Sequence, residues 1–419
     1  MKQLIIVGAG TAGTMMANKL VREMNPKEWT ISIIDKHKTH YYQPGFLFIP
    51  FGTYSEKDVI KKKTQFLPKG INFIQQGIHE IDGESNTITL EDGTKKSYDI
   101  LIIATGSVIV PEETEGLKGE GWHRDIFDFY TVEGATALRE RLKAWKGGKL
   151  LVHMTEMPIK CPVSPLEFAF LADSFFKDTG IREKVEITYA TPLSGAFTKA
   201  NCSLVLGHLL KDKGIDLVPD FDIEMVNDES KYIQSYDDKK IDFDLMVTVP
   251  TNMGDEVIER SELGDELRFI PTHPNTLQGK KYDNMFILGD ATDLPSSKAG
   301  SVAHFQAEVL TENIMLYVRD LELKPDFDGH ANCFIESGAG KAFLIDFNYD
   351  LEPVEGDFPL PGIGPFSLLK ETRMNHLGKL AFRWIYWNIL LKGRPMPGIS
   401  TQMSLRGKKI GHDRRKEHA

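Results

Sequence analysis

The chain has 419 residues, of which 41% are hydrophobic and 26% charged, and its formal net charge is -10. This composition excludes a disordered or fibrous protein, and the length suits two or three globular domains. Three cysteines are too few for a framework of structural disulfides, so we expect a reducing compartment in which a reactive cysteine is catalytic. We expect no signal peptide and no transmembrane helix, because no signal-like segment follows Met1 and no apolar run approaches about 18 residues.

The first predicted element is a strand over residues 4–7, which leads directly into the pattern Gly-x-Gly-x-x-Gly and then into a helix. In this pattern the first glycine permits a tight turn, the second lets the backbone approach a pyrophosphate, and the third allows close packing of helix on strand. A second strand, over residues 29–34, ends in a carboxylate that suits a ribose. Together they predict a dinucleotide site formed by Gly8, Gly10, Thr11, Ala12, Gly13 and Asp35.

Two later strands end in short motifs. Residues 101–106 finish in Ala-Thr-Gly, and residues 284–290 finish in Gly-Asp. Either motif alone would also suit an ordinary turn at the end of a strand. Both resemble motifs of the flavoproteins that have two dinucleotide-binding domains, which implies that the dinucleotide is FAD. The residues that this resemblance assigns to the cofactor are Ala104, Thr105, Gly106, Gly289 and Asp290.

A second nucleotide turn is missing. Members of that family that oxidise NAD(P)H carry another Gly-x-Gly-x-x-Gly after the strand that opens the inserted domain. Here that strand is predicted over residues 149–153, and residues 154–162 after it contain no glycine. Side chains and prolines would keep a pyrophosphate away from this backbone. We therefore expect no nicotinamide site.

A cysteine stands in that same turn. Cys161 follows Lys160 and precedes a helix predicted to begin around Ser164, which we expect to act as its cap. An adjacent ammonium group and a helix N-terminus favour the thiolate, so we expect the pKa of Cys161 to lie below about 8.5. Cys333 lies further along the chain, and Cys202 falls on a predicted helix. An isolated cysteine is usually a small buried hydrophobe, and we keep that interpretation for Cys202.

Over nearly its whole length the chain resembles the sulfide:quinone oxidoreductases. The resemblance is carried by the motifs above and by Tyr42-Gln43-Pro44-Gly45, Lys160-Cys161-Pro162, Ser297-Lys298-Ala299-Gly300, Cys333-Phe334 and residues 371–376. It implies that Cys161 and Cys333 form a redox pair. It also places Gln43 and Ala299 at the cofactor, and Lys298 beside the flavin pyrimidine. Some members have a further cysteine that residues 107–160 lack here, so we expect FAD to be held noncovalently.

The resemblance also implies the chemistry. Sulfide attacks a disulfide and leaves a persulfide on one cysteine and a thiolate on the other. The thiolate then passes two electrons to the flavin. We expect Cys161 to carry the persulfide and Cys333 to face the flavin. The alternatives that stay open are an NADH:quinone oxidoreductase of similar fold and a non-catalytic flavin redox sensor.

The C-terminal part of the chain is basic and contains an apolar helical face. From Phe366 to Ala419 there are twelve Lys or Arg against three Asp or Glu, a net charge of +9, so the rest of the chain carries -19. Helices are predicted over residues 366–391, with Leu377, Leu380, Ala381, Trp384, Trp387 and Leu391 within one arc.

This pattern is typical of a helix at an anionic membrane surface, although the same arc would suit packing on a core. The apolar content argues against nucleic acid as a partner. Phe334 and Phe366 are our candidates for lining a quinone site.

We therefore predict an α/β fold with two Rossmann-like domains and a C-terminal helical segment for membrane and quinone. Residues 1–107 and 270–330 form the FAD domain, 108–269 the inserted domain without a nicotinamide site, and 331–419 the C-terminal segment. The predicted function is oxidation of sulfide with electrons passed to a membrane quinone. The enzyme would lie peripherally on the cytoplasmic face of the cell membrane, without a metal. Both a monomer and a homo-oligomer stay open.

Overall fold

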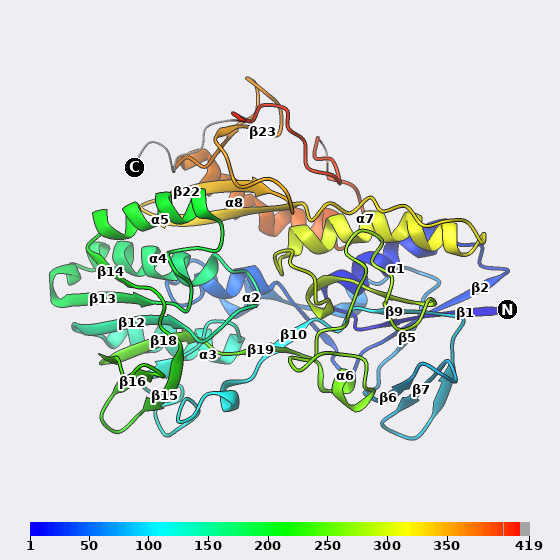
Figure 1. The fold of residues 1–419 in the computed structure, drawn as a ribbon, viewed down its shortest axis with the longest axis horizontal. Coiled ribbons are helices and arrows are strands. Elements are labelled where there is room, and N and C mark those ends of the chain that lie inside the picture. Colours follow the sequence, from blue (N-terminus) through cyan, green and yellow to red (C-terminus); the bar gives the residue numbers. More distant parts are fainter. Residues whose placement is uncertain (397, 411–419) are drawn as a thin grey trace.

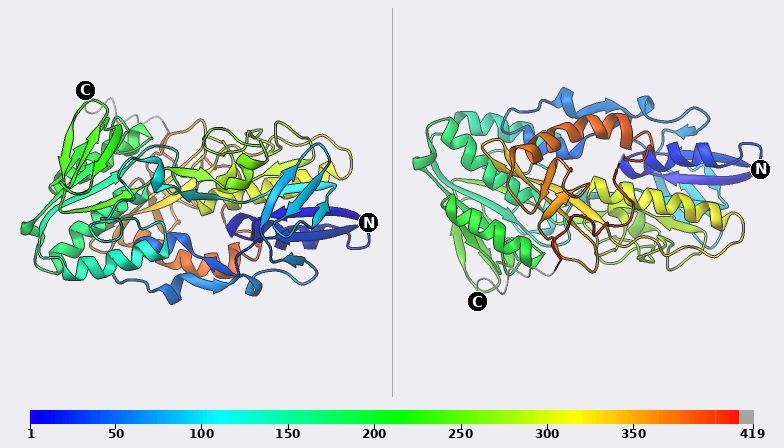
Figure 2. Two further views of the ribbon diagram at one scale, coloured as in Figure 1. Left: turned by 90° about the horizontal axis from the view of Figure 1, so that it is seen from below. Right: turned by 90° about the horizontal axis from the view of Figure 1, so that it is seen from above.

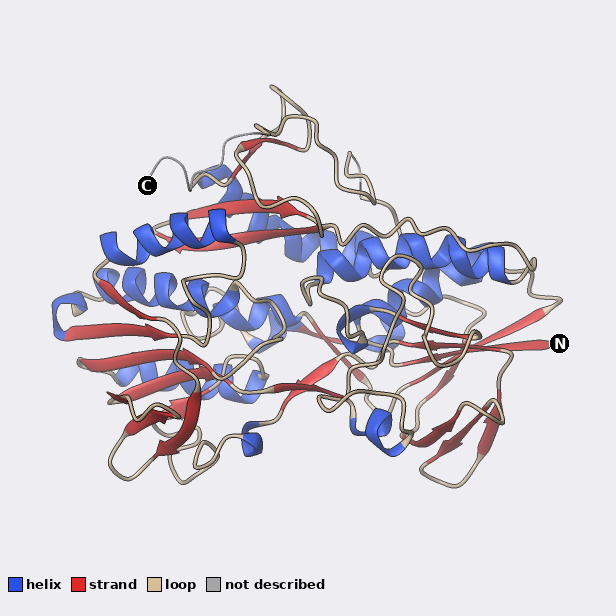
Figure 3. Cartoon of the chain, in the orientation of Figure 1, coloured by secondary structure: helices blue, strands red, loops and turns tan. Residues whose placement is uncertain are grey.

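A computed structural model describes residues 1–396 and 398–410, which form two parallel sheets side by side and a third sheet above them (Figures 1 and 3). The first parallel sheet has the strand order β20-β9-β1-β2-β5. Its strands are β1 (Lys2–Val7), β2 (Trp29–Ile34), β5 (Asn72–Ile74), β9 (Ile100–Ile103) and β20 (Met285–Ile287). Its central strands are continuous apolar runs because both of their faces are covered.

Two helices cover one face of this sheet and an antiparallel meander covers the other. The helices α1 (Thr11–Glu23) and α7 (Gly300–Tyr317) pack side by side above it in Figure 1. The meander consists of β6 (Ile78–Asp82), β7 (Thr87–Leu90) and β8 (Lys95–Ser97). This arrangement brings the carboxyl ends of β1, β9 and β20 to one edge, where ligands of open α/β sheets bind.

The second parallel sheet has the order β11-β18-β12-β13-β14. Its strands are β11 (Ile126–Phe127), β12 (Gly148–Met154), β13 (Val185–Ala190), β14 (Ile215–Val218) and β18 (Leu245–Val249). The helices packed with it are α3 (Val132–Ala144), α4 (Ser164–Asp178) and α5 (Ala200–Asp212). Its other face carries the meander β15 (Ile223–Asn227), β16 (Tyr232–Ser235) and β17 (Lys240–Asp242).

The chain crosses between the two sheets through one antiparallel pair of strands. β10 (Ser107–Ile109) leads into the second sheet and β19 (Asn252–Gly254) leads out of it, followed by α6 (Glu256–Arg260). The short elements β3 (Thr39–Tyr41), α2 (Glu56–Val59) and β4 (Ile60–Lys62) lie beside α8 in both views of Figure 2. The predicted α/β fold class with two dinucleotide-type domains is confirmed, while the exact domain limits stay a prediction.

The third sheet, of order β21-β22-β24-β23, brings the C-terminal part over the other two. It consists of β21 (Ala331–Gly338), β22 (Lys341–Phe347), β23 (Gly356–Phe358) and β24 (Phe366–Leu368), and α8 (Arg373–Ile385) and a π-helical turn, η6 (Tyr386–Leu390), follow. The predicted helical start at Phe366 is wrong, because residues 366–368 pair as a strand between β22 and β23. Among the described residues, no helix is long and apolar enough to cross a membrane.

Candidate functional site

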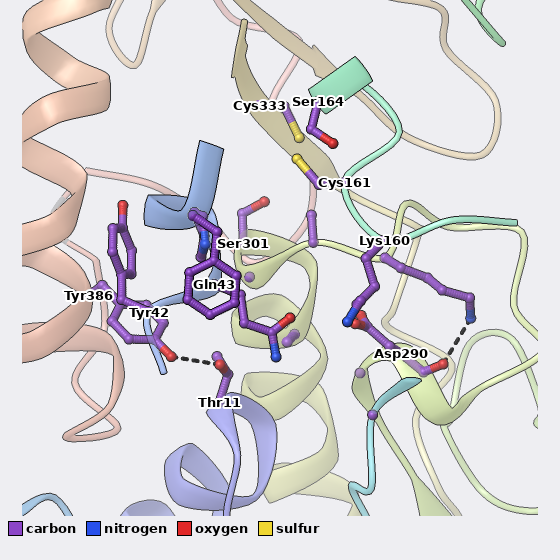
Figure 4. A pocket seen from close by; sticks show the side chains of 18 of the residues that line it. Thr11, Tyr42, Gln43, Lys160, Cys161, Ser164, Asp290, Ser301, Cys333 and Tyr386 are labelled. Atoms are coloured by element: carbon purple, nitrogen blue, oxygen red, sulfur yellow. Dashed lines mark hydrogen bonds between the residues drawn. The ribbon is translucent and has the colours of Figure 1, made fainter. Parts of the chain in front are cut away.

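One cavity lies where the carboxyl ends of β1, β9 and β20 meet the loop after β12, β21 and α8 (Figure 4). Most of the predicted site residues line it: Gly10, Thr11, Ala12, Gln43, Ala104, Thr105, Gly106, Cys161, Gly289, Asp290, Lys298, Ala299, Cys333 and Phe334. Four others do not line it, namely Gly8, Gly13, Asp35 and Phe366. Segments spread over more than three hundred residues of sequence thus contribute to one site.

The glycine turn after β1 is shaped for a ligand. Gly8 has φ +93°, and a Cβ there would overlap the carbonyl oxygen of Ala104. A Cβ on Gly13 would overlap the carbonyl oxygen of Gly8, so these two glycines serve backbone packing. A Cβ on Gly10 would meet no protein atom within 4 Å, which leaves that backbone open to the cavity. The N–H groups at the start of α1 are therefore available to a pyrophosphate.

The carboxylate at the end of β2 is held close to this turn. The backbone N–H of Ala9 donates to Asp35 at 2.8 Å, and the Lys63 ammonium forms an ion pair with the same carboxylate. Thr11 at the start of α1 forms a 2.7 Å hydrogen bond with the Tyr386 hydroxyl, drawn as a dashed line in Figure 4. The C-terminal η6 turn thus reaches the dinucleotide turn, which no sequence pattern indicated.

The other end of the predicted cofactor site contains a buried ammonium group. Lys298 donates to the carbonyl oxygens of Asp290 at 2.9 Å and Thr292 at 2.7 Å, and its nitrogen lies 3.9 Å from the centre of the Phe269 ring. Burial lowers the pKa of Lys298 to about 8, against the opposing effect of Asp290. Burial likewise raises the pKa of Asp290, which Lys298 and Lys160 oppose.

The two predicted redox cysteines lie close together although they come from different sheets. Figure 4 shows the sulfur atoms of Cys161, in the loop after β12, and Cys333, on β21, pointing toward one another. Both thiols are free in this structure. Cys161 has φ +47°, and its N–H donates to the carbonyl oxygen of Lys298 at 2.8 Å. The loop that carries Cys161 is therefore fixed against the predicted flavin-binding segment.

The predicted lowering of the Cys161 pKa is wrong. Burial raises the pKa of Cys161 to about 12, the Glu167 carboxylate adds to this, and the Lys379 ammonium opposes it. Lys160, whose ammonium group was expected to lower the pKa of Cys161, instead donates to the carbonyl oxygen of Ser107 at 3.1 Å. Burial, followed by the neighbouring Cys161, raises the pKa of Cys333 as well. Sequence adjacency indicated a charge effect, but it could not reveal that the thiol lines a cavity, where the loss of hydration outweighs the nearby charge.

The start of α4 also differs slightly from expectation. The helix begins at Ser164, and Val163 rather than Ser164 occupies the cap position. The Ser164 hydroxyl instead forms a 2.6 Å hydrogen bond with the hydroxyl of Tyr130, which also donates to the Lys160 carbonyl oxygen at 2.6 Å. Cys202 is fully buried on α5, as expected.

Beside the cysteines lies a group of buried charges that sequence reasoning missed. The Lys379 ammonium on α8 forms an ion pair with Glu167 on α4 and donates to the Phe334 carbonyl oxygen at 3.0 Å. Glu336 on β21 accepts a 2.9 Å hydrogen bond from His376 on α8. The only sign of this group in the sequence was Lys379 within a predicted helix, and a lysine there is also what an exposed helix face would show.

The apolar end of the cavity contains the aromatic side chain that we assigned to quinone. The rings of Phe334 and Phe366 lie edge to face, with centroids 5.4 Å apart. Gly378 on α8 makes room for both, since a Cβ there would lie 2.5 Å from the Phe366 ring and 2.8 Å from the Phe334 ring. Phe334 lines the cavity and Phe366 lies behind it.

The loop after β12 does not have the form of a nucleotide turn. β12 lies at the centre of the second sheet, where a Rossmann domain binds its pyrophosphate. Here Thr251 donates to the Glu156 carboxylate at 2.5 Å, and Met154 at the end of β12 and Ile159 in the loop after it are fully buried. Side chains rather than a glycine turn therefore follow the strand end at which a second pyrophosphate would bind.

The model of the pyridine nucleotide-disulphide oxidoreductase family matches residues 2–307. This chain belongs to that family. The mitochondrial sulfide:quinone oxidoreductases of Dictyostelium discoideum and Mus musculus are 28% and 25% identical to it, covering 94% and 93% of this chain and 86% of each relative.

A solved structure shows the same fold. The sulfide:quinone oxidoreductase of Aquifex aeolicus superposes with a TM-score of 0.78 at 21% identity, over 94% of this chain and 92% of that one. The expected resemblance is confirmed. The cofactor of this family is FAD, and the open backbone at Gly10 together with the Ala104 and Gly289 strand ends fits it.

Proposed function

We propose that this protein oxidises sulfide through Cys161 and Cys333 and passes the electrons, through FAD, to a membrane quinone. The observation that carries the proposal is the pair of facing sulfurs in a cavity that contains the glycine turn of an FAD site. The similarity to sulfide:quinone oxidoreductases supports the substrate, and the absence of glycine from residues 154–162 after β12 argues against NADH as donor.

The cysteine pair performs the sulfur chemistry. When the pair is oxidised, sulfide sulfur bonds to one cysteine sulfur, the disulfide bond breaks, and the bond's electron pair stays on the other cysteine as a thiolate. We assign the persulfide to Cys161 and the released thiolate to Cys333. Bound FAD supplies the two-electron acceptor, and Lys298 is placed to stabilise negative charge at that end of the site.

The quinone is proposed to enter at the aromatic end of the cavity. Phe334 provides a ring that faces the cavity, and Phe366 supports it from behind. Further apolar lining comes from Phe46, Leu47 and Phe382. A quinone ring stacks well against such side chains, since both are flat and apolar.

The surface around α8 is proposed to lie on an anionic membrane. Met374, Leu377 and Trp384 are 46%, 55% and 62% exposed, and their spacing places them along one side of the helix. Trp387 was predicted to share this face, but this is wrong: it is buried and stacks on Phe66 with centroids 5.0 Å apart.

Basic side chains gather near the end of α8, where Arg383 also forms an ion pair with Asp58 on α2. Lys61 on β4 lies 4.5 Å from the Trp387 ring centre, and burial, with Arg383 and Lys392 nearby, lowers the pKa of Lys61. Clustered cations beside exposed tryptophan and leucine suit an anionic bilayer surface. We propose peripheral attachment at the cytoplasmic face of the cell membrane. Part of the basic excess, at residues 414–416, lies outside the described residues.

Anaerobic titration of the purified flavoprotein tests the proposed function. Sulfide should bleach the flavin absorbance at once, and a quinone added afterwards should restore it. NADH should leave the absorbance unchanged, because the loop after β12 offers no pyrophosphate site. Rapid bleaching by NADH would favour the dehydrogenase, and sulfide bleaching without steady quinone turnover would favour a redox sensor.

A further inference from the structure

The buried ion pair beside the cysteines has an incomplete set of hydrogen bonds. Glu167 is fully buried on α4 and lines the cavity together with Cys161, Cys333 and Lys379. Its Oε1 accepts from the backbone N–H of Glu336 at 2.7 Å and from the Lys379 ammonium. Its Oε2 has no hydrogen-bond partner among the described residues. A buried carboxylate oxygen without a partner costs free energy, so its retention calls for a ligand or a reacting group.

We propose that Glu167 accepts a proton from the sulfide that reacts at the cysteine pair, and that Lys379 then stabilises the thiolate left behind. This inference rests on the proposed function, because it assigns a proton acceptor to that same reaction. The Lys379 ammonium is close enough to both cysteines to favour their thiolates, and Glu167 is close enough to both to disfavour them. The carboxylate and the thiolate therefore compete for the same cation.

The step balances in atoms and charge. Hydrogen sulfide, the Cys161–Cys333 disulfide and the Glu167 carboxylate become a persulfide with its S–H, a thiolate and a neutral carboxyl group. The disulfide bond breaks, a bond forms between sulfide sulfur and one cysteine sulfur, and one proton moves from sulfide to Glu167. Because the negative charge moves from carboxylate to thiolate while Lys379 stays positive, the net charge of the buried cluster does not change.

A constant net charge matters because both members of the ion pair are largely removed from solvent, with side-chain exposures of 12% for Lys379 and 0% for Glu167. Neutral hydrogen sulfide enters a buried cavity at lower cost than its anion, since an unpaired charge loses its hydration there. Without an acceptor, the leaving proton would stay on sulfur and weaken the nucleophile. Burial raises the pKa of Glu167, which makes its carboxylate a better proton acceptor, while Lys379 opposes this rise.

Other charged and titratable groups face Glu167 from every neighbouring element. They are Lys379 on α8, Glu336 on β21, the two cysteine thiols and the Tyr130 hydroxyl. Glu336 in turn accepts from His376, whose side chain is 24% exposed. Among these groups, Glu167 alone both lines the cavity and has a carboxylate oxygen without a hydrogen-bond partner.

The test is the pH dependence of flavin reduction by sulfide, measured by rapid mixing with the oxidised holoenzyme. Glu167→Gln should lower the rate on the order of 10²-fold where hydrogen sulfide is the main species. The loss should shrink as the pH rises through the first pKa of hydrogen sulfide, because HS⁻ needs no acceptor. A loss of the same size at every pH, or no loss, would overturn the proposal.

Two further variants separate this role from folding and from the proposed function. Glu167→Asp keeps a carboxylate and should keep the wild-type shape of the pH profile at a lower rate. If its profile instead has the shape expected for Glu167→Gln, the proposal is overturned. This holds even where the Glu167→Gln variant itself fails to bind FAD. Asp173→Asn neutralises another buried acid on α4, paired with Arg182 away from the cavity, and should leave rate and profile unchanged. If sulfide fails to reduce wild-type flavin at all, the proposed function fails instead.

Discussion

Cys161 and Cys333 come from segments far apart in the sequence, and the cavity brings their sulfurs face to face. Burial raises the pKa of both thiols, which favours the protonated form of the reduced pair and makes it less nucleophilic. Cys202 is buried on α5 and does not line the cavity. The two groups of cysteines should therefore respond very differently to substitution.

We predict that Cys161→Ser and Cys333→Ser each abolish sulfide-dependent quinone reduction. Cys202→Ser should retain turnover, since that thiol only fills core space. Residues that act as one unit lose activity non-additively, so the double variant should be no worse than either single variant. Steady-state quinone assays with flavin content matched among variants would measure this. Near-wild-type turnover in either single variant would contradict a redox pair.

A second prediction at the residue scale concerns the flavin. Residues 107–160 contain no cysteine, and the site offers Gly10, Ala104 and Gly289 as backbone contacts for FAD. Acid precipitation should therefore release all of the yellow colour into the supernatant. Flavin that remains with the denatured chain would contradict noncovalent binding, and mass spectrometry of the pellet would locate the bond.

At the scale of elements, the sequence could predict those structures whose signals are local. The strand, glycine turn and helix over residues 2–23 form as expected, because the turn needs glycines at fixed spacing and the strand is a continuous apolar run. The two strand-end motifs at Gly106 and Gly289 also appear where predicted, and both glycines have positive φ.

Features set by distant packing could not be predicted. The apolar arc expected in the C-terminal helix is not a single face in the structure. Its residues on α8 are exposed or partly exposed, whereas those from η6 onward are buried in the core. Trp384 is exposed, whereas Trp387, three residues later, stacks on Phe66. Likewise, no local pattern reveals that Glu167 and Lys379, 212 residues apart, form a buried pair.

Two glycines in helices allow a matched test of the aromatic end of the cavity. A Cβ on Gly378 in α8 would press on the rings of Phe366 and Phe334, so Gly378→Ala should destabilise the fold by roughly 1–3 kcal/mol through overpacking. Gly207→Ala in α5 meets only an ordinary contact at 3.9 Å and should stabilise by about 0.4–1 kcal/mol.

Thermal unfolding and the KM for quinone measure the two effects separately. If Phe334 lines the quinone site, Gly378→Ala should raise the KM for quinone while sulfide still bleaches the flavin at the wild-type rate. Gly207→Ala should change neither kinetic quantity. An unchanged KM for quinone in Gly378→Ala would move the quinone site away from these rings.

At the scale of the whole molecule, the basic C-terminal segment differs in charge from the rest of the chain. Residues 1–365 carry -19, and the segment from Phe366 onward carries +9. That segment cannot simply be removed, because Lys379, Phe382 and Tyr386 line the cavity and β24 belongs to the third sheet. Truncation before Phe366 would therefore damage the FAD site, and membrane attachment must be tested by surface substitutions.

We predict that replacing Met374, Leu377 and Trp384 together by Ser weakens attachment to anionic vesicles without harming the sulfide half-reaction. These side chains are exposed, so their loss should not disturb the core, whereas insertion of their apolar surface into the headgroup region should disappear. A control triple variant replaces Val108, Tyr236 and Leu321 by Ser, since these are comparably exposed but lie on other elements.

Flotation with anionic vesicles at low and high salt, together with turnover of a long-chain quinone, gives the readout. The wild type and the control variant should float at low salt and be released in part as salt rises, because each nearby Lys or Arg contributes on the order of 1 kcal/mol that salt screens. The α8 variant should stay soluble and turn over the long-chain quinone slowly, while sulfide bleaches its flavin normally. If the wild type ignores anionic vesicles even at low salt, or the control loses binding as readily as the α8 variant, this side of α8 is not the membrane surface.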